Sequence, residues 1–253
     1  MMSADDTARY GSVEWFVNEY ARVVDDPWGL SWRPSQKLRY LHTLELLDRI
    51  DRPLSSIIDI GCATGDITFL LSKKYESASI VGMDFTESAI RRAMCKYPSL
   101  QFRVGSIFDV ERQFNEVVDL ALCLEVLYYI DSAEQSQALD SVWRALRPGG
   151  YALFSSFHGK PPYLSRNDLI NAAVRRFKYV DEVTIYATPL TKLERFGMKI
   201  DKLATKVKCT RLSIAVRKTA DNLPVTLALR VEDVGRRWFS RFATSHFVVL
   251  VQK

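Results

Sequence analysis

A run of small residues in the first third of the chain could hold a cofactor. Residues 57–66 read Ile-Ile-Asp-Ile-Gly-Cys-Ala-Thr-Gly-Asp, so a stretch of strand-forming residues leads into a turn and then an amphipathic helix pattern. Gly61, Ala63 and Gly65 put almost no side chain in the way of a bound molecule. Asp84 ends the next expected strand, where a carboxylate can accept hydrogen bonds from ribose hydroxyls. This spacing predicts a site for a nucleoside-containing cofactor.

The residues after Gly65 argue against two classes of phosphate-bearing cofactor. P-loop nucleoside triphosphatases need Lys-Ser or Lys-Thr after the final glycine, whereas Asp66-Ile67 stands there in this chain. A dinucleotide site has its third small residue three positions after the second, at a helix N-terminus that holds the pyrophosphate. Asp66 occupies that position, and an acid there would repel phosphates. A carboxylate opposite the turn instead suits a cofactor with a positive centre and no phosphates.

Alternating strand and helix patterns surround this turn. We expect strands at 55–60, 79–84, 101–104, 118–124, 151–156 and 246–251, and helices at 66–75, 86–96 and 133–146. A tight turn, Arg147-Pro148-Gly149-Gly150, is expected before the strand at 151–156. This alternation is typical of an α/β protein with a parallel sheet and helices on both of its faces.

The flanking regions are expected to belong to the same single domain of residues 1–253. Residues 1–53 form an N-terminal aromatic and helical cap, in which Ser35 caps a helix that runs to about Ile50. Residues 54–159 form the cofactor-binding core, and residues 160–253 form the sheet edge with a substrate-side insertion. Within that last part we expect helical character at 167–177 and 191–196, a strand at 183–186 and extended chain, including a hairpin, from Met198 to Val216.

Five motifs in register resemble those of the class I S-adenosylmethionine-dependent methyltransferases. They cover about residues 54–157, and one departure is Ala63, where the family usually has glycine. The motifs are Asp59-Ile60-Gly61-Cys62-Ala63-Thr64-Gly65, Asp84, Gly105-Ser106-Ile107, Leu122-Cys123-Leu124-Glu125-Val126-Leu127-Tyr128-Tyr129 and Leu146-Arg147-Pro148-Gly149-Gly150.

The resemblance implies a Rossmann-like, mostly parallel seven-stranded sheet with an antiparallel terminal strand. It also implies S-adenosyl-L-methionine as the cofactor and no metal. Ser106 and the Ile107 amide would contact the adenine, and Phe85 would form an apolar wall beside it. The full set of expected cofactor-binding residues is Asp59, Gly61, Ala63, Gly65, Asp84, Phe85, Ser106, Ile107 and Cys123.

Methyl transfer from a sulfonium is an in-line displacement, in which positioning of the acceptor supplies much of the rate. A general base is optional for a neutral amine and helps a hydroxyl. Side chains that follow the fourth and fifth strands lie at the mouth of such a sheet. Glu125, Tyr128 and His158 are therefore the candidate catalytic residues, with His158 as base or substrate contact. Of the adjacent Tyr128 and Tyr129, only one is expected to face the pocket.

The acceptor is less well defined than the cofactor. Asp26-Pro27-Trp28, the helix near Ser35 and residues 125–129 resemble the NodS group, which N-methylates an amino sugar; the N-terminal aromatics would then form a lid. This likeness favours a small molecule, carbohydrate or specialised metabolite as substrate, with an amine slightly ahead of a hydroxyl. Two alternatives stay open: methylation of RNA or another phosphate-bearing substrate, and a non-catalytic protein that keeps the cofactor fold to bind a partner.

Composition and charge set wider bounds. No apolar stretch approaches the roughly 18 residues that span a bilayer, the N-terminus has no secretory pattern, and the four cysteines lack zinc-type spacing. A cytoplasmic location is the simplest expectation. Residues 1–159 hold 16 basic and 22 acidic side chains, whereas residues 160–253 hold 19 and 8. The basic C-terminal region could attract nucleic acid, a phosphorylated substrate, an acidic partner or a membrane surface, or it could be a solvated face. The oligomeric state is not predicted.

Overall fold

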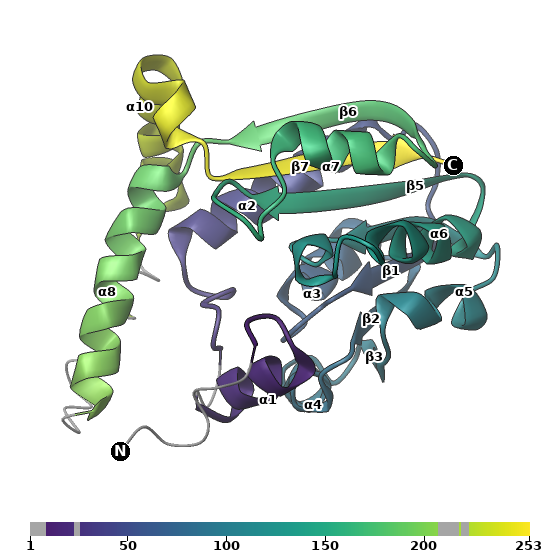
Figure 1. Ribbon diagram of the computed structural model, residues 1–253, viewed down its shortest axis with the longest axis horizontal. Helices are drawn as coiled ribbons and strands as arrows, with labels where there is room; N and C mark the ends of the chain where they lie inside the picture. Colours follow the sequence, from purple (N-terminus) through teal and green to yellow (C-terminus); the bar gives the residue numbers. More distant parts are fainter. Residues whose placement is uncertain (1–8, 23–25, 207–217, 219–222) are drawn as a thin grey trace. The chain divides into compact units, whose positions relative to one another are not determined.

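The computed structural model describes residues 9–22, 26–206, 218 and 223–253, and contains a seven-stranded sheet (Figure 1). The strands follow the order β3-β2-β1-β4-β5-β7-β6, and β7 runs against its neighbours in Figure 1. Their bounds are β1 Ser56–Ile60, β2 Ser79–Asp84, β3 Gln101–Val104, β4 Val118–Cys123, β5 Leu146–Phe157, β6 Lys178–Ile185 and β7 His246–Gln252. The expected Rossmann-like fold class, with a mostly parallel sheet, is confirmed.

The parallel register brings the carboxyl ends of the inner strands to one edge of the sheet. Ile60 of β1 lies opposite Met83 of β2 and Cys123 of β4, and Cys123 lies opposite Phe154 of β5. Since a chain leaving a parallel strand continues at that edge, the segments after β1, β2, β4 and β5 start close together. This edge carries the candidate site.

Helices cover both faces of the sheet, as the alternating side chains of β1 show. Ile58 and Ile60 join the main apolar core together with residues of α5, α6 and α7, whereas Asp59 points to the other face and accepts a hydrogen bond from Thr68 of α3. The helices in this part of the chain are α1 Val13–Arg22, α3 Asp66–Lys74, α4 Glu87–Lys96, α5 Val110–Gln113, α6 Gln135–Ala145 and α7 Arg166–Ala173.

The chain divides into two compact units. The first consists of Met1–Pro27, Leu46–Glu182 and Phe247–Lys253, and the second of Trp28–Glu45 and Val183–His246. The second unit contains most of α2 Pro34–Leu46, together with α8 Thr188–Lys206 and α10 Val225–Ala243. Among the described residues, no helix is long and apolar enough to cross a membrane. The single-domain organisation expected from the sequence stays a prediction.

Three local expectations differ from the structure. The turn at Arg147–Gly150 lies inside β5, because Leu146 pairs with Val118 and Tyr151 with Leu120, so the four residues between them form a bulge. The segment from Met198 to Lys206 belongs to α8 and is not extended; residues 207–217 lie outside the described part of the chain.

Ser35 is not the cap of α2. Pro34 is the first helical residue, as its fixed backbone angle and missing N–H favour. The Ser35 amide and hydroxyl both donate to the carboxylate of Glu194, at 2.7 Å and 2.5 Å. A distant acid therefore satisfies the backbone donor of this helix end, and no local cap is needed.

Candidate active site

The turn after β1 is held in a conformation that suits small residues. Gly61, Ala63 and Gly65 all have positive φ angles, of 74°, 50° and 81°. A Cβ atom on Gly61 would lie 2.4 Å from Cγ2 of Val126, and one on Gly65 would lie 2.7 Å from Cζ of Phe102. The backbone of the turn thus packs directly on neighbouring side chains, which fixes its position without side chains of its own.

Asp84 ties this turn to the end of β2. Its two carboxylate oxygens accept hydrogen bonds from the backbone amides of Ala63, at 3.0 Å, and Thr86, at 2.8 Å. The side chain is buried, and burial raises the pKa of Asp84 while those two hydrogen bonds oppose the rise. An ionised carboxylate offers about four acceptor sites, so acceptor capacity remains for the hydroxyls of a ribose.

The two other acids of the turn face inward. Asp59 accepts a hydrogen bond from Thr68 Oγ1 at 2.5 Å and is buried. Asp66 lies 2.7 Å from Nζ of Lys96 and also accepts hydrogen bonds from Thr64 and Tyr97. The charge of Asp66 is therefore largely balanced by Lys96. The expectation that Asp66 repels phosphates is weakened, although its side chain still occupies the position that a dinucleotide-binding turn leaves small.

A carboxylate and a buried serine meet at the ends of β4 and β5. Glu125 lies two residues after the end of β4 and has a positive φ of 62°. Its Oε1 accepts a hydrogen bond from Ser155 Oγ at 2.6 Å, and its backbone amide donates to the same serine oxygen at 2.9 Å. The Tyr128 hydroxyl donates to Oε2 at 3.1 Å. Ser155 and Tyr128 thus orient a half-buried carboxylate at the mouth of the sheet.

Aromatic side chains surround this carboxylate. The rings of Tyr128 and Tyr129 have centroids 4.4 Å apart, and the Tyr163 ring lies 4.9 Å from Tyr128. The Tyr10 hydroxyl lies 3.4 Å from that of Tyr129 and 3.3 Å from that of Tyr163. We call these four residues the tyrosine cluster. The pKa of each of Tyr10, Tyr128 and Tyr129 is raised above the ordinary tyrosine value, and burial is the largest cause. These phenols therefore stay neutral at physiological pH.

The N-terminal segment closes over the cluster. Gly11, with a φ of 82°, passes so near the Tyr129 ring that a Cβ atom would lie 2.8 Å from Cδ1. Arg9 forms an ion pair with Asp131, and Phe16 of α1 packs on both Tyr129 and Phe85, with centroid distances of 4.9 Å and 5.2 Å. Figure 1 shows α1 beside α4. These contacts bring the N-terminal aromatics to the residue that follows Asp84, as a lid requires.

Comparison with known families shows which family this chain belongs to. The family model described as "Methyltransferase domain" matches residues 51–206, more than half of the chain. The chain belongs to this methyltransferase family. The expected class of enzyme, S-adenosylmethionine-dependent methyltransferase, and the expected cofactor are thereby confirmed.

Individual relatives carry different names, and each aligns with part of this chain. Nodulation protein S of Rhizobium tropici is 33% identical over 140 residues, which are 53% of this chain and 56% of that protein. Trans-aconitate 2-methyltransferase of Deinococcus radiodurans is 29% identical over 101 residues, 40% of this chain and 37% of that protein. The methyltransferase thus aligns with about half the length of these curated relatives or less.

A solved structure extends the likeness of fold to most of the chain. The N-methyltransferase NodS of Bradyrhizobium japonicum WM9, in complex with S-adenosyl-l-homocysteine, superposes with a TM-score of 0.60 at 19% identity. The match covers 93% of this chain and 98% of that one. At this identity, it is the fold that the two proteins share.

The remaining expected cofactor residues of the methyltransferase lie at the same edge of the sheet, but not all through their side chains. The Ser106 hydroxyl accepts a hydrogen bond from the Phe108 amide and caps a short helix at Ile107–Asp109. The side chains of Ile107 and Cys123 point into the main core, and burial raises the pKa of Cys123. Contact of these two residues with a cofactor would therefore be through the backbone. Phe85 is 37% exposed and free to form an apolar wall.

This arrangement fits S-adenosylmethionine. Close packing holds the backbone of the turn in place beside Asp84, and the Asp84 carboxylate keeps acceptor capacity for ribose hydroxyls. Bound there, the cofactor would supply an electrophilic methyl group on a positively charged sulfur. The residues expected to hold it, Asp84 and the glycine turn foremost, stay predictions at the level of single contacts.

The raised pKa of Asp84 leads to a test by pH. Ribose hydroxyls donate to the ionised carboxylate, so cofactor binding favours the charged form. Affinity for S-adenosylhomocysteine should therefore rise with pH from the ordinary aspartate range through the raised pKa, and level off above it. Replacing Asp84 by Asn should flatten this profile and weaken binding about ten- to a hundredfold. Calorimetric titration across pH measures both the profile and the loss of affinity. The matched control is Asp181→Asn, a change at a partly exposed acid that is paired with Arg49.

Folding should depend on pH in the opposite sense. The pKa of Asp84 is higher in the folded protein than in the unfolded chain. The contribution of Asp84 to the free energy of unfolding therefore falls as the pH rises from the ordinary aspartate pKa to the raised pKa. Without cofactor, Asp84→Asn should therefore gain stability relative to wild type across that window, less the cost of the backbone amide that Asn leaves unpaired. A pH-independent affinity for the cofactor in wild type would contradict the role given to Asp84.

The structure does not join His158 to the other candidate catalytic residues of the methyltransferase. His158 is exposed just after β5, and its ring packs edge-on against Phe247 of β7, with centroids 5.5 Å apart. Among the described residues, it makes no hydrogen bond and no ring contact with Glu125 or the tyrosine cluster. Glu125 and Tyr128, in contrast, are hydrogen-bonded to each other. The arrangement favours Glu125 over His158 as the group next to an acceptor, and His158 as a base stays a prediction.

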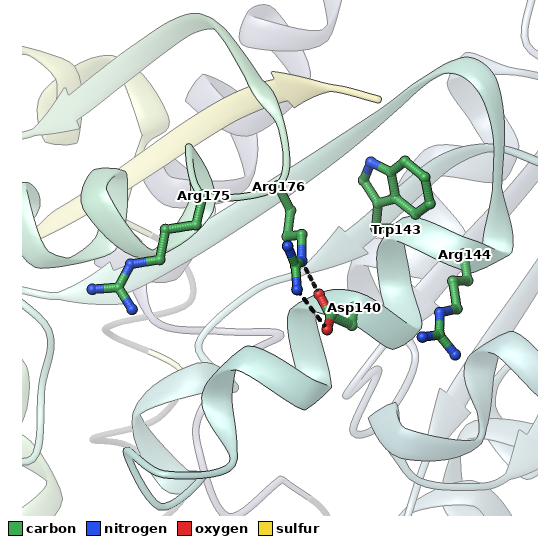
Figure 2. Close-up of a pocket in the computed structure, with 5 residues that line it drawn as sticks. All are labelled: Asp140, Trp143, Arg144, Arg175 and Arg176. Atoms are coloured by element: carbon green, nitrogen blue, oxygen red, sulfur yellow. Dashed lines mark hydrogen bonds and ion pairs between the residues drawn. The ribbon is translucent and has the colours of Figure 1, made fainter.

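A separate hollow of about 340 Å³ lies on the surface of the methyltransferase at α6 and the end of α7 (Figure 2). Asp140 pairs with Arg176 there, and Arg176 lowers the pKa of that carboxyl. Arg144 is bonded to Glu111 outside the hollow, and Figure 2 shows Arg175 pointing away from the Asp140 pair. Because the hollow's acid and two of its arginines are already paired, its charges do not mark it as a substrate site.

Sequence reasoning missed three residues of the site. Ser155 looked like an ordinary residue of a buried strand, although its place near the carboxyl end of β5, beside β4, is a signal that could have found it. Tyr163 ends a Lys-Pro-Pro-Tyr string and Tyr10 lies in an aromatic N-terminal segment, and neither pattern indicates a site residue. Both depend on contacts with residues far away in sequence, so no local pattern shows their role.

Proposed function

We propose that this chain transfers a methyl group from S-adenosylmethionine to an amine of a small molecule or carbohydrate. One observation carries the proposal: an oriented carboxylate, Glu125, beside a cluster of neutral tyrosines at the carboxyl edge of the sheet. An aromatic face attracts an ammonium group, and more so in a site shielded from water. A carboxylate next to it adds a charge partner and a hydrogen-bond acceptor.

The chemistry needs few groups from the protein. The amine lone pair forms a bond to the methyl carbon while the bond from carbon to sulfur breaks, and the sulfonium becomes a neutral thioether. A proton must leave the nitrogen, and Glu125 is placed to accept it or to pass it to solvent. Tyr128 and Ser155 hold the carboxylate in place, so the acceptor is positioned before reaction.

The same site suits a hydroxyl acceptor less well. A hydroxyl must lose its proton as it attacks, which calls for a stronger base than a carboxylate. A neutral amine carries its own nucleophilic lone pair and needs mainly orientation. The NodS structure is that of an N-methyltransferase, which also supports an amine. A carbohydrate carrier is proposed from the resemblance of this sequence to the NodS group.

The test compares acceptors that differ only at the nitrogen. With labelled S-adenosylmethionine, an amino sugar oligomer should accept methyl, whereas its N-acetylated and hydroxyl counterparts should accept at least about a hundredfold less, since a half-buried carboxylate and aromatic faces lose their cationic partner. Calorimetric binding of S-adenosylhomocysteine, run in parallel, separates a missing acceptor from a missing cofactor. Equal methylation of the hydroxyl counterpart, or methylation of RNA in place of the amine panel, would overturn the proposal.

A further inference from the structure

Helix α10 of the second unit leaves a row of large apolar side chains exposed. Leu227, Val234 and Trp238 recur at intervals of seven and four residues, so they lie along one face of the helix. Their exposed fractions are 43%, 53% and 77%. The backbone departs from helical angles at Phe239, and Phe239 and Phe242 beyond it are 59% and 78% exposed. We call these five residues the apolar row.

Another face of α10 already holds the helix to its own unit. Ala228 and Glu232 are buried, and a Cβ atom on Gly235 would lie 3.1 Å from the carbonyl oxygen of Tyr186. Glu232 accepts a hydrogen bond from the Tyr186 amide and bonds with Nε2 of His42. Because these contacts anchor the helix, the apolar row is not needed to dock it. Large contiguous exposed apolar surface usually marks a binding surface.

Basic residues run beside the apolar row. Arg230 and Arg237 each stand three positions after a member of the row, and both are exposed. Arg237 shares Asp233 with Arg236, whereas Arg230 forms no ion pair with the described residues. Over the whole second unit, residues 28–45 and 183–246, the sequence has 16 basic and 6 acidic side chains. A partner that binds the apolar row must therefore be attracted by an excess of positive charge.

The positive charge favours one kind of binding partner for the apolar row over another. A second copy of the chain would bring its own arginines to the same contact, because a two-fold interface repeats one surface on both sides. Like charges would then face each other around the row. An anionic lipid surface offers the opposite charge over a wide area, together with an apolar layer just beneath it. Tryptophan and phenylalanine on one side of a helix, with arginine on the next, is the pattern of helices that lie in that layer.

We propose that α10 binds the surface of an anionic membrane, with the apolar row inserted among the lipids and the neighbouring arginines at the headgroups. The helix would lie in the plane of the membrane, since no described helix of this chain can cross it. This binding brings the enzyme to an interface, and it does not depend on which acceptor the active site takes.

The test uses the full-length protein and vesicles. Wild type should sediment with vesicles of phosphatidylglycerol and phosphatidylcholine and not with phosphatidylcholine alone, and salt should weaken the binding. The double variant Trp238→Ser/Phe242→Ser should bind the anionic vesicles more than about tenfold less tightly, because it removes two large inserting side chains. Tyr179→Ser, an exposed aromatic change outside α10, is the matched control.

Charge reversals distinguish binding through the α10 surface from a general attraction by net charge. Arg230→Glu should weaken binding more than Lys178→Glu, which changes the net charge equally at an exposed site outside the second unit. A blue shift of tryptophan emission on mixing, absent in Trp238→Phe, should accompany binding by wild type. Circular dichroism verifies that each variant is folded.

Three results would overturn the proposal. The first is no sedimentation with anionic vesicles at low salt. The second is sedimentation that the double variant leaves unchanged. The third is a wild-type dimer in solution that the double variant converts to monomer, which would assign the apolar row to a second copy.

Discussion

Replacing Glu125 by Gln is expected to lower kcat/KM for the amine acceptor by about a hundredfold. The carboxylate accepts hydrogen bonds from Ser155 and Tyr128, and an amide can accept only through its single oxygen. The amide nitrogen would then face a hydroxyl donor, and the negative charge that attracts an ammonium would be gone. Hydrogen bonds to a charged group contribute about 1.5–3 kcal/mol, which corresponds to roughly ten- to a hundredfold or slightly more. Steady-state assays with the best acceptor measure it.

Glu116 provides a matched control for this substitution. It also has a positive φ, of 52°, but lies on the surface between α5 and β4. Glu116→Gln therefore repeats the change of side chain in the same backbone conformation, and should leave kcat/KM unchanged. Binding of S-adenosylhomocysteine should be close to wild type in both variants. An active Glu125→Gln enzyme would remove the carboxylate from the mechanism and return attention to His158.

Ser155 allows a finer distinction. Its hydroxyl bonds both the amide and the carboxylate of Glu125, and so positions that residue without any described contact to a reacting atom. Ser155→Ala should consequently lower kcat while the preference for amine over hydroxyl is kept. Glu125→Gln should reduce that preference itself.

The parts of the site that sequence could predict are those that a local pattern fixes. Gly61, Ala63 and Gly65 occur in a turn whose backbone angles and close packing select small residues, and Asp84 follows at the end of the next strand. Glu125 could be predicted in the same way, because it lies two residues after a buried strand that is apolar except for Asp119. In each of these cases the residue type and its place after a strand carry the information.

Other parts depend on packing between distant segments. Tyr10 and Tyr129 are 119 residues apart, and nothing near Tyr10 in the sequence indicates its partner. Ser35 has the residue type of a helix cap but donates to Glu194, 159 residues away. The prediction of extended chain for the second half of α8 was wrong for a different reason. Short apolar and polar alternations after Met198 suggest extended chain, whereas Leu193, Phe196 and Ile200 recur at helical spacing.

Replacing Gly61 by Ala is expected to abolish useful cofactor binding and to destabilise the fold by about 2–5 kcal/mol. A left-handed backbone costs an alanine about 1–2 kcal/mol, and the φ of Gly61 is 74°. The added Cβ would also lie 2.4 Å from Cγ2 of Val126, so either the turn or the segment after Glu125 must move. Forcing extra atoms into packed surroundings costs about a further 1–3 kcal/mol. Chemical denaturation and titration with S-adenosylhomocysteine measure the two effects.

Gly149 separates these two causes, because it has nearly the same φ, 73°, but open space around it. The nearest atom to a Cβ there is Nε2 of Gln252 at 3.8 Å, an ordinary contact distance. Gly149→Ala should therefore show only the backbone cost, about 1–2 kcal/mol, and normal cofactor affinity. The double variant Gly61→Ala/Val126→Ala should recover the part due to the clash, and a double-mutant cycle isolates that coupling. If Gly61→Ala were no more harmful than Gly149→Ala, close packing of the turn against Val126 would not be what positions the cofactor.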